Sequence, residues 1–345
     1  MRSELEHCAR ASLVFDLATI DATMTRVAAA ARAVGIVPLF AAKSFPHARV
    51  LALAAEHLDG FDVASPHELR AVPRAKLISV IDPSGAAIAC AAERSERLIV
   101  GCETIAQVHA APARAELAIR ISASVTGRDP AVGAILDGSG HRRSRFGLDD
   151  RAQIAALAAA GRGRRIGLHV HHGPVIATSA ERFVATARAA LALVDFEPAF
   201  LDLGGAWHGI VDHAGAFAEI RAAIPRSIEL VVEPGRLFAQ RAGFAVGLVT
   251  AARTVADREL RVVDLSRACH LRWSPVELVA PAPRPGHGVR VSIVGPTCYE
   301  EDTIGEWTIE PAHVDRRVIL RDVPGYALAW NTGFGGVPPA DVIVR

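Results

Sequence analysis

Eight short apolar segments, each long enough for one β-strand, constrain the fold of this chain more than any other feature. They are Val37–Ala42, Phe61–Ala64, Leu77–Ile81, Leu98–Gly101, Leu117–Ile121, Ile166–Val170, Phe200–Leu203 and Ile228–Val232. Helical patterns alternate with them at Ala18–Val34, Ala48–His57, Ala86–Ala92, Thr104–Ala110, Ala152–Ala160, Ala180–Val194 and Ala214–Ala223. Strands that are apolar almost throughout are buried on both faces, which favours a closed parallel barrel. The prediction is an α/β fold with a (β/α)8 TIM-like barrel, and a doubly wound open sheet is the alternative.

The pattern changes after Arg236, where the strong helical runs stop. β-branched segments follow at Phe244–Thr250, Leu260–Asp264, Val289–Val294, Val318–Leu320 and Val342–Val344, with Pro and Gly between them. Such segments are typical of an all-β domain. A further short strand is predicted at Leu13–Asp16. The chain of 345 residues is also long enough for two domains. We therefore predict a barrel domain at 17–238 and a β domain made of 239–345 together with 1–16.

The charge and cysteine content exclude several classes of protein. A net charge of +1 provides no basic field for nucleic acid or anionic lipid. The first ten residues are polar and charged, so no signal peptide is predicted, and no apolar run is long enough to span a membrane. The five cysteines are widely spaced without a C-x-x-C pair, which argues against a disulfide framework and against a zinc site. We expect a cytoplasmic protein without a metal.

The segment Ile36 to Pro46 is an apolar strand that ends in a cation, Lys43. A buried ammonium is so unfavourable that it loses its proton, pairs with an anion or becomes covalently bonded. Taken by itself, the segment is also compatible with an exposed lysine at a strand end. The ends of the other strands decide between these interpretations.

Polar residues, glycines or a proline lie at the carboxyl ends of most of the predicted barrel strands. They are Lys43; Asp62 and Ser65; Arg120; His169, His171 and Gly173; Asp202, Gly204 and Gly205; and Glu233, Pro234, Gly235 and Arg236. In a barrel the carboxyl ends of the strands form the catalytic face, so these groups should converge. Glycine turns let backbone N–H groups approach an anion, so Gly204-Gly205 and Gly235-Arg236 could together hold one phosphate.

A series of motifs runs along the chain in a fixed order. The motifs are Phe40-Ala-Ala-Lys43-Ser, Phe61-Asp62-Val-Ala-Ser65-Pro-His-Glu68-Leu, Arg120, Ser144-Arg-Phe-Gly147, Gly167-Leu-His-Val-His171-His-Gly173, Leu201-Asp-Leu-Gly-Gly205, Glu233-Pro-Gly-Arg236, Gly295-Pro-Thr-Cys298 and Gly325-Tyr326. The motifs and their order resemble one enzyme family, the pyridoxal-phosphate decarboxylases with an alanine-racemase-type barrel (fold type III). That family includes the diaminopimelate, ornithine and arginine decarboxylases.

The resemblance implies a role for each matching residue. Lys43 would bond to the aldehyde of pyridoxal 5'-phosphate, Glu233 would face the pyridine nitrogen, and His171 would stack on the ring. Asp62 and Arg120 would support them. The phosphate would be held by Gly204, Gly205, Gly235, Arg236 and Tyr326. Cys298 would donate a proton into the active site of the other subunit of a homodimer, so that the sites are shared.

The sequence departs from the family pattern at several positions. His171-His172-Gly173-Pro174 replaces the usual Gly-Ser after the stacking histidine, so the serine that contacts phosphate is missing. Ala206 stands where the third glycine is usual. Tyr299 follows Cys298, where the decarboxylases of basic amino acids have an acid that binds the distal amine. Glu300, Glu301 or Asp302 could replace that acid after a small shift.

Three functions fit the residues. The first is α-decarboxylation of an amino acid, with diaminopimelate as the default substrate. The second is a racemase, but barrel racemases of this type place an arginine against the pyridine nitrogen, whereas this chain has Glu233. The third is a non-catalytic homologue that binds or regulates a partner. Tyr299, Arg272 and Trp207 are the candidate substrate-binding residues, and they suggest a substrate whose far end is not simply an ammonium.

Overall fold

The computed structural model of the chain describes residues 2–91, 93–126, 135–136, 142–171, 180–256, 258–283, 286, 288–310 and 316–345. The chain forms two compact units. One unit contains Thr23–Lys43 and His47–Leu237, and the other contains Met1–Ala22, Ser44–Pro46 and Phe238–Arg345. The first is called the barrel unit below and the second the sheet unit.

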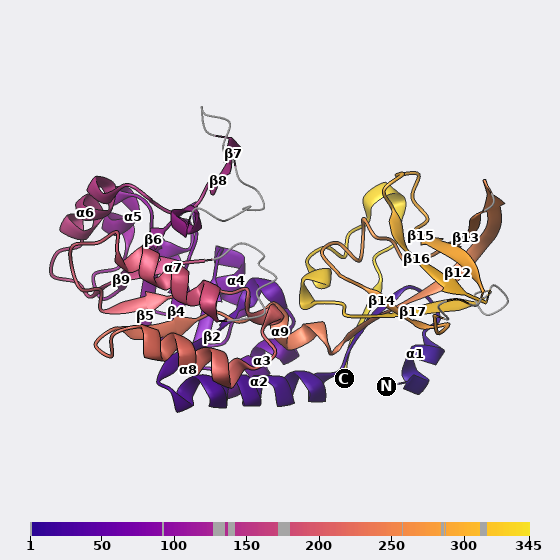
Figure 1. The fold of residues 1–345 in the computed structure, drawn as a ribbon, viewed down its shortest axis with the longest axis horizontal. Coiled ribbons are helices and arrows are strands. Elements are labelled where there is room, and N and C mark those ends of the chain that lie inside the picture. Colours follow the sequence, from indigo (N-terminus) through magenta and orange to yellow (C-terminus); the bar gives the residue numbers. More distant parts are fainter. Residues whose placement is uncertain are drawn as a thin grey trace. The chain divides into compact units, whose positions relative to one another are not determined.

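Eight parallel strands form the closed barrel, in the order β10, β11, β2, β3, β4, β5, β6, β9 (Figure 1). Their bounds are β2 Ile36–Ala41, β3 Gly60–Val63, β4 Ala75–Val80, β5 Ser95–Cys102, β6 Glu116–Ile121, β9 Ile166–Val170, β10 Phe200–Asp202 and β11 Glu229–Val232. Each strand coincides with one of the predicted apolar segments. The barrel is therefore confirmed and the open sheet is wrong. A two-stranded antiparallel pair, β7 (Ile135–Leu136) with β8 (Arg142–Arg143), lies between β6 and β9 in sequence.

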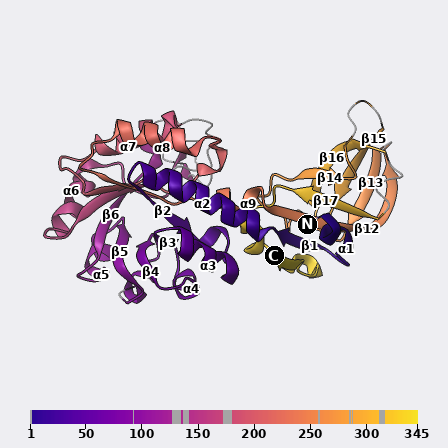
Figure 2. The same ribbon diagram turned by 90° about the horizontal axis from the view of Figure 1, so that it is seen from below.

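Helices surround the barrel strands (Figure 2). They are α2 Leu17–Ala33, α3 Ala48–His57, α4 Pro66–Ala71, α5 Ile105–Ala110, α6 Arg151–Ala160, α7 Glu181–Leu191, α8 His213–Ala223 and α9 Arg236–Gln240. The predicted helix over Ala86–Ala92 is wrong, because the described part of that segment holds only a short 3-10 turn, η2 (Ile88–Cys90). The buried Asp82 carboxylate accepts hydrogen bonds from the backbone N–H groups of Ser84 and Ala87 and holds the segment in a turn instead.

The interior of the barrel is filled by one apolar layer drawn from most of the strands. It consists of Leu39, Leu77, Ile99, Ala118, Phe200 and Val231, all 3% exposed or less. Burying a leucine, isoleucine or phenylalanine side chain contributes about 1.5–3 kcal/mol. This layer therefore makes the barrel a packed core rather than a pore.

A ring of ion pairs closes the amino end of the barrel. Arg97 donates to Glu116 Oε1 and to Glu229 Oε1, each at 2.7 Å. Arg165 donates to Glu116 Oε2 at 2.6 Å and to Glu229 Oε2 at 2.7 Å. Both guanidinium groups lie over the Phe200 ring, at 6.0 and 5.4 Å from its centroid. The ring thus joins residues at the starts of β5, β6, β9 and β11, at the end opposite to the catalytic face.

The sheet unit is built on an eight-stranded sheet in which β14, β17, β12, β13, β15 and β16 follow one another and β1 pairs with β12 and β18. The strands are β1 Ser12–Phe15, β12 Gly243–Val255, β13 Arg258–Val263, β14 Glu277–Ala280, β15 Val289–Val294, β16 Thr303–Ile309, β17 Arg317–Arg321 and β18 Asp341–Val344. The predicted strands are all present, while β14 and β16 were not predicted. A short helix, α1 (Arg2–His7), precedes β1.

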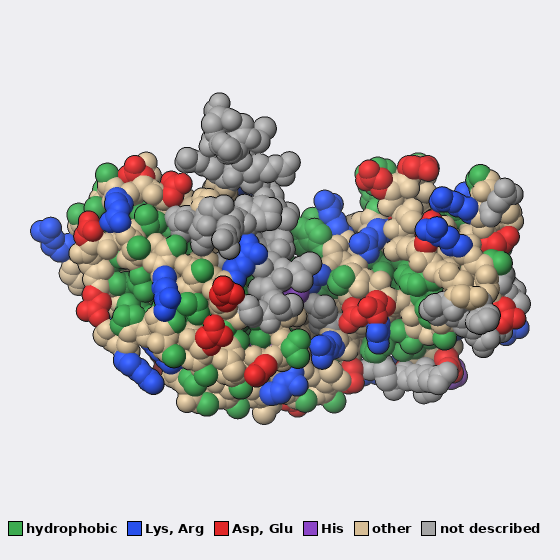
Figure 3. All heavy atoms as spheres, in the orientation of Figure 1, with side chains coloured by type: hydrophobic (Ala, Val, Ile, Leu, Met, Phe, Trp, Pro, Cys, Tyr) green, Lys and Arg blue, Asp and Glu red, His purple; other side chains and the backbone are tan. Residues whose placement is uncertain are grey.

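The surface carries both signs of charge. On the face drawn in Figure 3, basic and acidic side chains are interspersed over both units, in keeping with the net charge of +1. Among the described residues, none of the helices combines the length and the apolar character that crossing a membrane requires.

Candidate active site

The carboxyl ends of the barrel strands bring the predicted polar residues to one face. Arg120 of β6 lies opposite His169 of β9, and His169 in turn lies opposite Asp202 of β10. Asp62 of β3 lies opposite Ala41 of β2, two residues before Lys43. Neighbouring parallel strands therefore place an amine, a guanidinium, an imidazole and two carboxyl groups around one barrel mouth.

Lys43 is fixed by a buried carboxylate. It lies in the 3-10 turn η1 (Ala42–Ser44) that follows β2, and its side chain is 34% exposed. Its Nζ donates a hydrogen bond to Oδ2 of Asp62, which is completely buried. Burial raises the pKa of Asp62 to about 6, the Glu233 carboxylate adds to that rise, and Lys43 opposes it. Lys43 is therefore not a plain exposed lysine at a strand end.

The turn that carries Asp62 is held by a reciprocal helix cap. Ser65 is the N-cap of α4, and its Oγ accepts a hydrogen bond from Glu68 N at 3.2 Å. The Glu68 carboxylate accepts one from Ala64 N at 2.9 Å. This arrangement satisfies N–H groups at the helix start and fixes the path of the chain after β3. Burial raises the pKa of Glu68, which lies close enough to Lys43 and Asp62 to interact with their charges.

A buried cluster of His169, Asp202 and Glu233 lies at the ends of β9, β10 and β11. One donor atom from each residue lies within 4.8 Å of the others, and His169 Nε2 is 3.8 Å from Glu233 Oε2. Burial, reinforced by Arg120, lowers the pKa of His169 to about 3, so its ring is neutral at pH 7. Among the described residues, Glu233 Oε1, Asp202 Oδ2 and both His169 ring nitrogens have no hydrogen-bond partner. Buried polar atoms without partners are costly, so the cluster suits a polar ligand group.

The same three donors are also a pattern that divalent metal ions use. The sequence analysis predicted no metal on the basis of cysteine spacing, and this stays a prediction.

The glycine turn after β10 brings His171 against the backbone. Gly204 has a φ of +62°, and a Cβ at this position would lie 2.8 Å from the His171 ring. Gly204 O accepts hydrogen bonds from Glu233 N at 2.8 Å and from Trp207 Nε1 at 2.7 Å. Only glycine meets both the backbone angle and the close approach. Ala206, which replaces the third glycine of the family pattern, also has a positive φ of 71°.

His171 is neutral in this setting. Burial lowers its pKa to about 3, and the charge of Lys43 acts in the same direction. Gly235 is buried and Arg236 is half-buried, and both follow Glu233 at the start of α9. Gly173 and Pro174 lie outside the described residues. They belong to the segment in which the sequence departs from the phosphate motif of the family.

Arg120 is held by an acid that the sequence analysis missed. Its Nη1 donates to Glu103 Oε1 at 3.2 Å, and its guanidinium lies 4.4 Å from the centroid of the Phe146 ring. Glu103 Oε2 accepts a hydrogen bond from Gly147 N at 2.9 Å. Glu103 thus ties the Ser144–Gly147 motif to β6. It directly follows β5, so the strand-end rule that identified the other residues would also have found it.

In the sheet unit, Cys298 and Tyr299 lie on an exposed turn between β15 and β16. Tyr299 is 48% exposed, and its hydroxyl donates to Glu301 Oε2 at 2.6 Å. Asp302 is 3% exposed and accepts hydrogen bonds from Ser266 Oγ, Thr297 Oγ1 and three backbone N–H groups. Asp302 is therefore a structural acid that fastens two loops together, and the suggestion that it binds substrate is wrong.

A cluster of aromatic side chains lies on loops of the sheet unit. The Arg272 guanidinium is 4.4 Å from the centroid of the Trp330 ring, and Trp273 packs edge-on against Trp330 and Tyr326 at centroid distances of 5.1 and 5.8 Å. Arg272 also lies close enough to Tyr299 for its charge to act on the phenol. Tyr326 lies in the 3-10 turn η6 (Gly325–Leu328).

Trp207 does not line a barrel mouth as predicted. It is 1% exposed, it stacks on Phe183 of α7 at a centroid distance of 4.0 Å, and it contacts Phe217 of α8 at 5.1 Å. The 3-10 turn η4 (Trp207–Gly209) folds the indole beneath these helices, where its N–H is satisfied by Gly204 O. Its role is to anchor the glycine turn, and the prediction that it contacts substrate is wrong.

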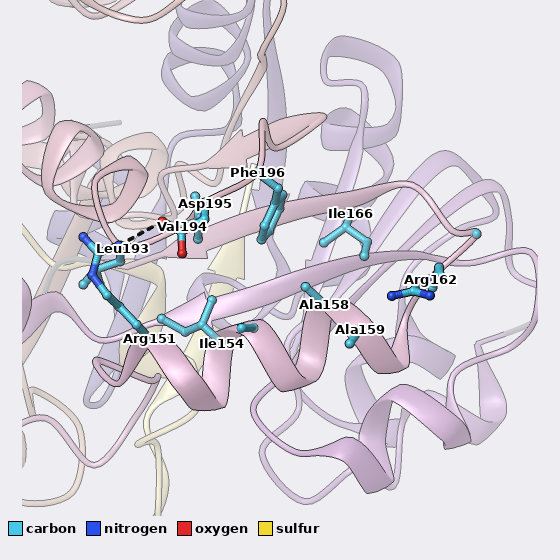
Figure 4. Close-up of a pocket in the computed structure, with 12 residues that line it drawn as sticks. Arg151, Ile154, Ala158, Ala159, Arg162, Ile166, Leu193, Val194, Asp195 and Phe196 are labelled. Atoms are coloured by element: carbon cyan, nitrogen blue, oxygen red, sulfur yellow. Dashed lines mark hydrogen bonds and ion pairs between the residues drawn. The ribbon is translucent and has the colours of Figure 1, made fainter.

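A hollow of about 430 Å³ lies elsewhere on the barrel unit, between α6 and the segment after α7 (Figure 4). Ile154, Leu193, Val194 and Phe196 line it, and Arg151 at one side pairs with Asp195 at 3.2 Å. None of the predicted site residues is among those that line it. The chemistry-bearing residues are therefore at the strand ends and not in this hollow.

The sequence matches one family model, described as the pyridoxal-dependent decarboxylase, pyridoxal binding domain, over residues 17–240. A diaminopimelate decarboxylase of Vibrio cholerae is 27% identical over 222 residues. That match covers 57% of this chain and 50% of the relative, so the similarity extends over about half of the relative's length.

Solved structures share the fold over the whole chain. An arginine decarboxylase of Paramecium bursaria Chlorella virus, bound to agmatine, has a TM-score of 0.78 at 17% identity and covers 100% of this chain and 99% of its own. A lysine/ornithine decarboxylase of Vibrio vulnificus, complexed with cadaverine, gives 0.79 at 18% identity with 100% and 97% covered. A diaminopimelate decarboxylase of Helicobacter pylori, complexed with L-lysine, gives 0.77 at 17% identity with 100% and 93% covered.

Proposed function

Because the chain belongs to the pyridoxal-dependent decarboxylase family, we propose that it is a pyridoxal-phosphate-dependent α-decarboxylase of an amino acid or an amino-acid-derived intermediate. The observation that carries this proposal is the pairing of a lysine with a buried acid, Lys43 with Asp62, beside the buried carboxylate Glu233. An amine that can bond to an aldehyde and a carboxylate that can face a pyridine nitrogen are the two groups this chemistry needs.

The described residues fit the cofactor. Glu233 Oε1 is buried without a hydrogen-bond partner among them, which suits a protonated ring nitrogen. His171 packs against Gly204, where it can lie against a ring face. Lys43 would hold the aldehyde carbon. When bound, pyridoxal phosphate supplies an electron sink for the bond that breaks at the substrate Cα.

Glu233 decides which reaction the site favours. A carboxylate beside the pyridine nitrogen keeps a proton on it, and this strengthens the electron sink that decarboxylation uses. The neighbouring His169 cannot supply that proton, because its pKa of about 3 leaves it neutral at pH 7. An arginine in place of Glu233 would favour racemisation instead. The complete set of polar groups argues against a non-catalytic homologue.

The phosphate is assigned to Gly204, Gly205, Gly235, Arg236 and Tyr326. The glycines leave backbone N–H groups open to an anion, and Arg236 adds a positive charge. We assign Cys298 as the proton donor to the substrate carbon. It is exposed on its own sheet unit, which suits a residue that acts in the site of a second subunit, and the working unit is accordingly a homodimer with shared sites.

The substrate is an amino acid or an amino-acid-derived intermediate whose distal end is not a bare ammonium. Tyr299 stands where the basic-amino-acid members have an acid, Glu301 is engaged with the Tyr299 hydroxyl, and Asp302 is buried. Arg272 lies near Tyr299 and provides a cation. These groups favour a distal carboxylate or a distal group of mixed charge, as in diaminopimelate.

Carbon dioxide release tests the proposal directly. Purified protein supplied with pyridoxal phosphate is incubated with diaminopimelate, ornithine, lysine, arginine, and amino acids with a distal carboxylate. The expected result is release from a substrate with a distal carboxylate, and little from ornithine, lysine or arginine. Tyr299→Asp should increase the relative rate with the three basic amino acids, whereas Tyr299→Phe should not. Absence of release from every substrate, or racemisation without release, would overturn the proposal.

A further inference from the structure

Two carboxyl groups at the barrel mouth are buried side by side. Asp202 is 0% exposed and Glu233 is 2% exposed, and one carboxylate oxygen of each lies within 4.8 Å of the other. Asp202 Oδ1 accepts a hydrogen bond from Gly204 N at 2.9 Å, and its other oxygen has no partner among the described residues. An ionised aspartate that is completely buried normally accepts several hydrogen bonds, so a single donor is too few.

The cations near Asp202 and Glu233 are hydrogen-bonded to other acids. Lys43 hydrogen-bonds to Asp62, and Arg120 hydrogen-bonds to Glu103. In the described part of the chain no salt bridge joins a lysine or arginine to Asp202 or Glu233, and the charge of Arg120 acts on Glu233 only from a distance. The His169 ring, 3.8 Å from Glu233, is neutral. His171, the remaining titratable group that faces the site, is neutral as well. Two adjacent buried carboxyl groups without cations cannot both ionise.

We propose that Asp202 is a positioning residue that stays protonated at neutral pH and presents its carboxyl proton to Glu233, so that the pair carries one negative charge. The Gly204 N–H marks Oδ1 as the accepting oxygen of Asp202, which leaves Oδ2 to carry the proton. Burial raises the pKa of Asp202 well above its ordinary value, and the Glu233 charge adds to the rise.

The consequence for the site rests on the proposed function. A pair with one negative charge is matched by one positive charge, such as a protonated ring nitrogen facing Glu233. A hydrogen bond from Asp202 would fix the orientation of the Glu233 carboxylate and leave its other oxygen for the ligand. The protonation state of Asp202 itself does not depend on which reaction the protein catalyses.

Infrared absorption spectroscopy of the full chain tests the protonation state. The carbonyl stretch of a protonated carboxyl group is recorded at pH 8, before and after removal of cofactor. At this pH Asp62 is ionised, because its pKa is about 6. Wild type should show the band in both states, and Asp202→Asn should remove it. Asp82→Asn is the matched control, since Asp82 is also buried but accepts several hydrogen bonds that lower its pKa; it should keep the band.

Two results would overturn the proposal: no band in wild type, or a band that survives Asp202→Asn. The wild-type measurement stands even if Asp202→Asn does not fold. A protein that binds no pyridoxal phosphate would refute the proposed function and leave this infrared result intact.

Cofactor affinity tests the positioning role. An asparagine imitates a protonated aspartate and keeps a donor, so Asp202→Asn should bind pyridoxal phosphate within about threefold of wild type. Asp202→Ala leaves Glu233 without that donor and should bind about 10- to 100-fold more weakly. The pH dependence of the absorbance of bound cofactor should be unchanged in Asp202→Asn. If Asp202→Asn is as weak as Asp202→Ala, the site needs a second negative charge and the proposal fails.

Discussion

Lys43 and Asp62 form an ion pair in which the amine is partly exposed and the acid is completely buried. Asp62 lies in β3, and Lys43 lies in the turn η1 that directly follows β2, the neighbouring strand of the barrel. The acid orients the amine without hiding it, which is what a lysine that must bond to an incoming aldehyde requires. The same burial makes Asp62 a sensitive reporter of pH.

Asp62→Asn should change how stability depends on pH. The pKa of Asp62 in the folded protein is about 6, above its ordinary value of 3.8. The folded state therefore holds this proton more tightly than the unfolded state does. The contribution of the proton to the free energy of unfolding is fully present below about pH 4 and is lost as the pH rises through 6. The unfolding free energy of Asp62→Asn, minus that of wild type, should rise by about 2 kcal/mol from pH 4 to pH 7.5. Urea unfolding at several pH values measures it, and a flat or falling difference would refute the assigned burial.

Glu233→Gln should separate binding from reaction. The amide retains the size of the side chain, so pyridoxal phosphate should still bind, but it cannot keep a proton on the ring nitrogen. We expect most of the decarboxylation rate to be lost, by about 100-fold or more. Glu219→Gln, on the exposed face of α8, is the control. Near-normal turnover by Glu233→Gln would contradict the role given to Glu233.

Arg97→Leu should destabilise the barrel without weakening the site. Arg97 bridges Glu116 and Glu229 at the amino end, and its side chain is 27% exposed. Removing it leaves two carboxylates with Arg165 as their only partner in the ring, which should cost about 1–3 kcal/mol of unfolding free energy. The affinity for pyridoxal phosphate should be unchanged. A loss of affinity with unchanged stability would show that the two ends of the barrel are not independent.

Shared sites predict complementation between inactive subunits. Lys43→Ala and Cys298→Ala should each be inactive. In a freely exchanging mixture about half of the dimers are heterodimers with one intact site, so activity should return to about a quarter of wild type. Light scattering must first show a dimer, and subunit exchange must be confirmed. A mixture that stays inactive after exchange would place the action of Cys298 within its own chain, or exclude it.

The barrel could be predicted from the sequence because each of its strands is a local apolar run, and a parallel barrel repeats that signal. The strands of the sheet unit were harder to predict from the sequence. β14 is only four residues long, and β16 contains Gly305 within a strand whose pairing with β15 shifts register. Their strand character comes from partners distant in sequence, which local patterns do not reveal.

Residues of the candidate site could be predicted where a charged residue directly follows an apolar strand, as for Lys43 and Glu233. The prediction for Trp207 failed because a bulky residue after a strand can turn inward as easily as outward, and only the packing of α7 and α8 decides. The burial of Asp302 was equally difficult to predict, because several of its hydrogen-bond donors, at Ser266 to Ala268, lie more than thirty residues earlier in the sequence. The strands that carry Asp202 and Glu233 are neighbours in the predicted barrel, but the burial of both carboxyl groups depends on the packing around them, which the sequence does not show.

The most direct test of the account is to locate the bonded cofactor. The chain has two lysines, and Lys76 lies near the start of β4, at the end of the barrel opposite to Lys43. Purified protein loaded with pyridoxal phosphate should be yellow, and Lys43→Ala should not be, whereas Lys76→Ala should keep the colour. Borohydride reduction followed by peptide mass mapping should find the pyridoxyl group on Lys43. A pyridoxyl group on Lys76, or on no lysine, would contradict the account.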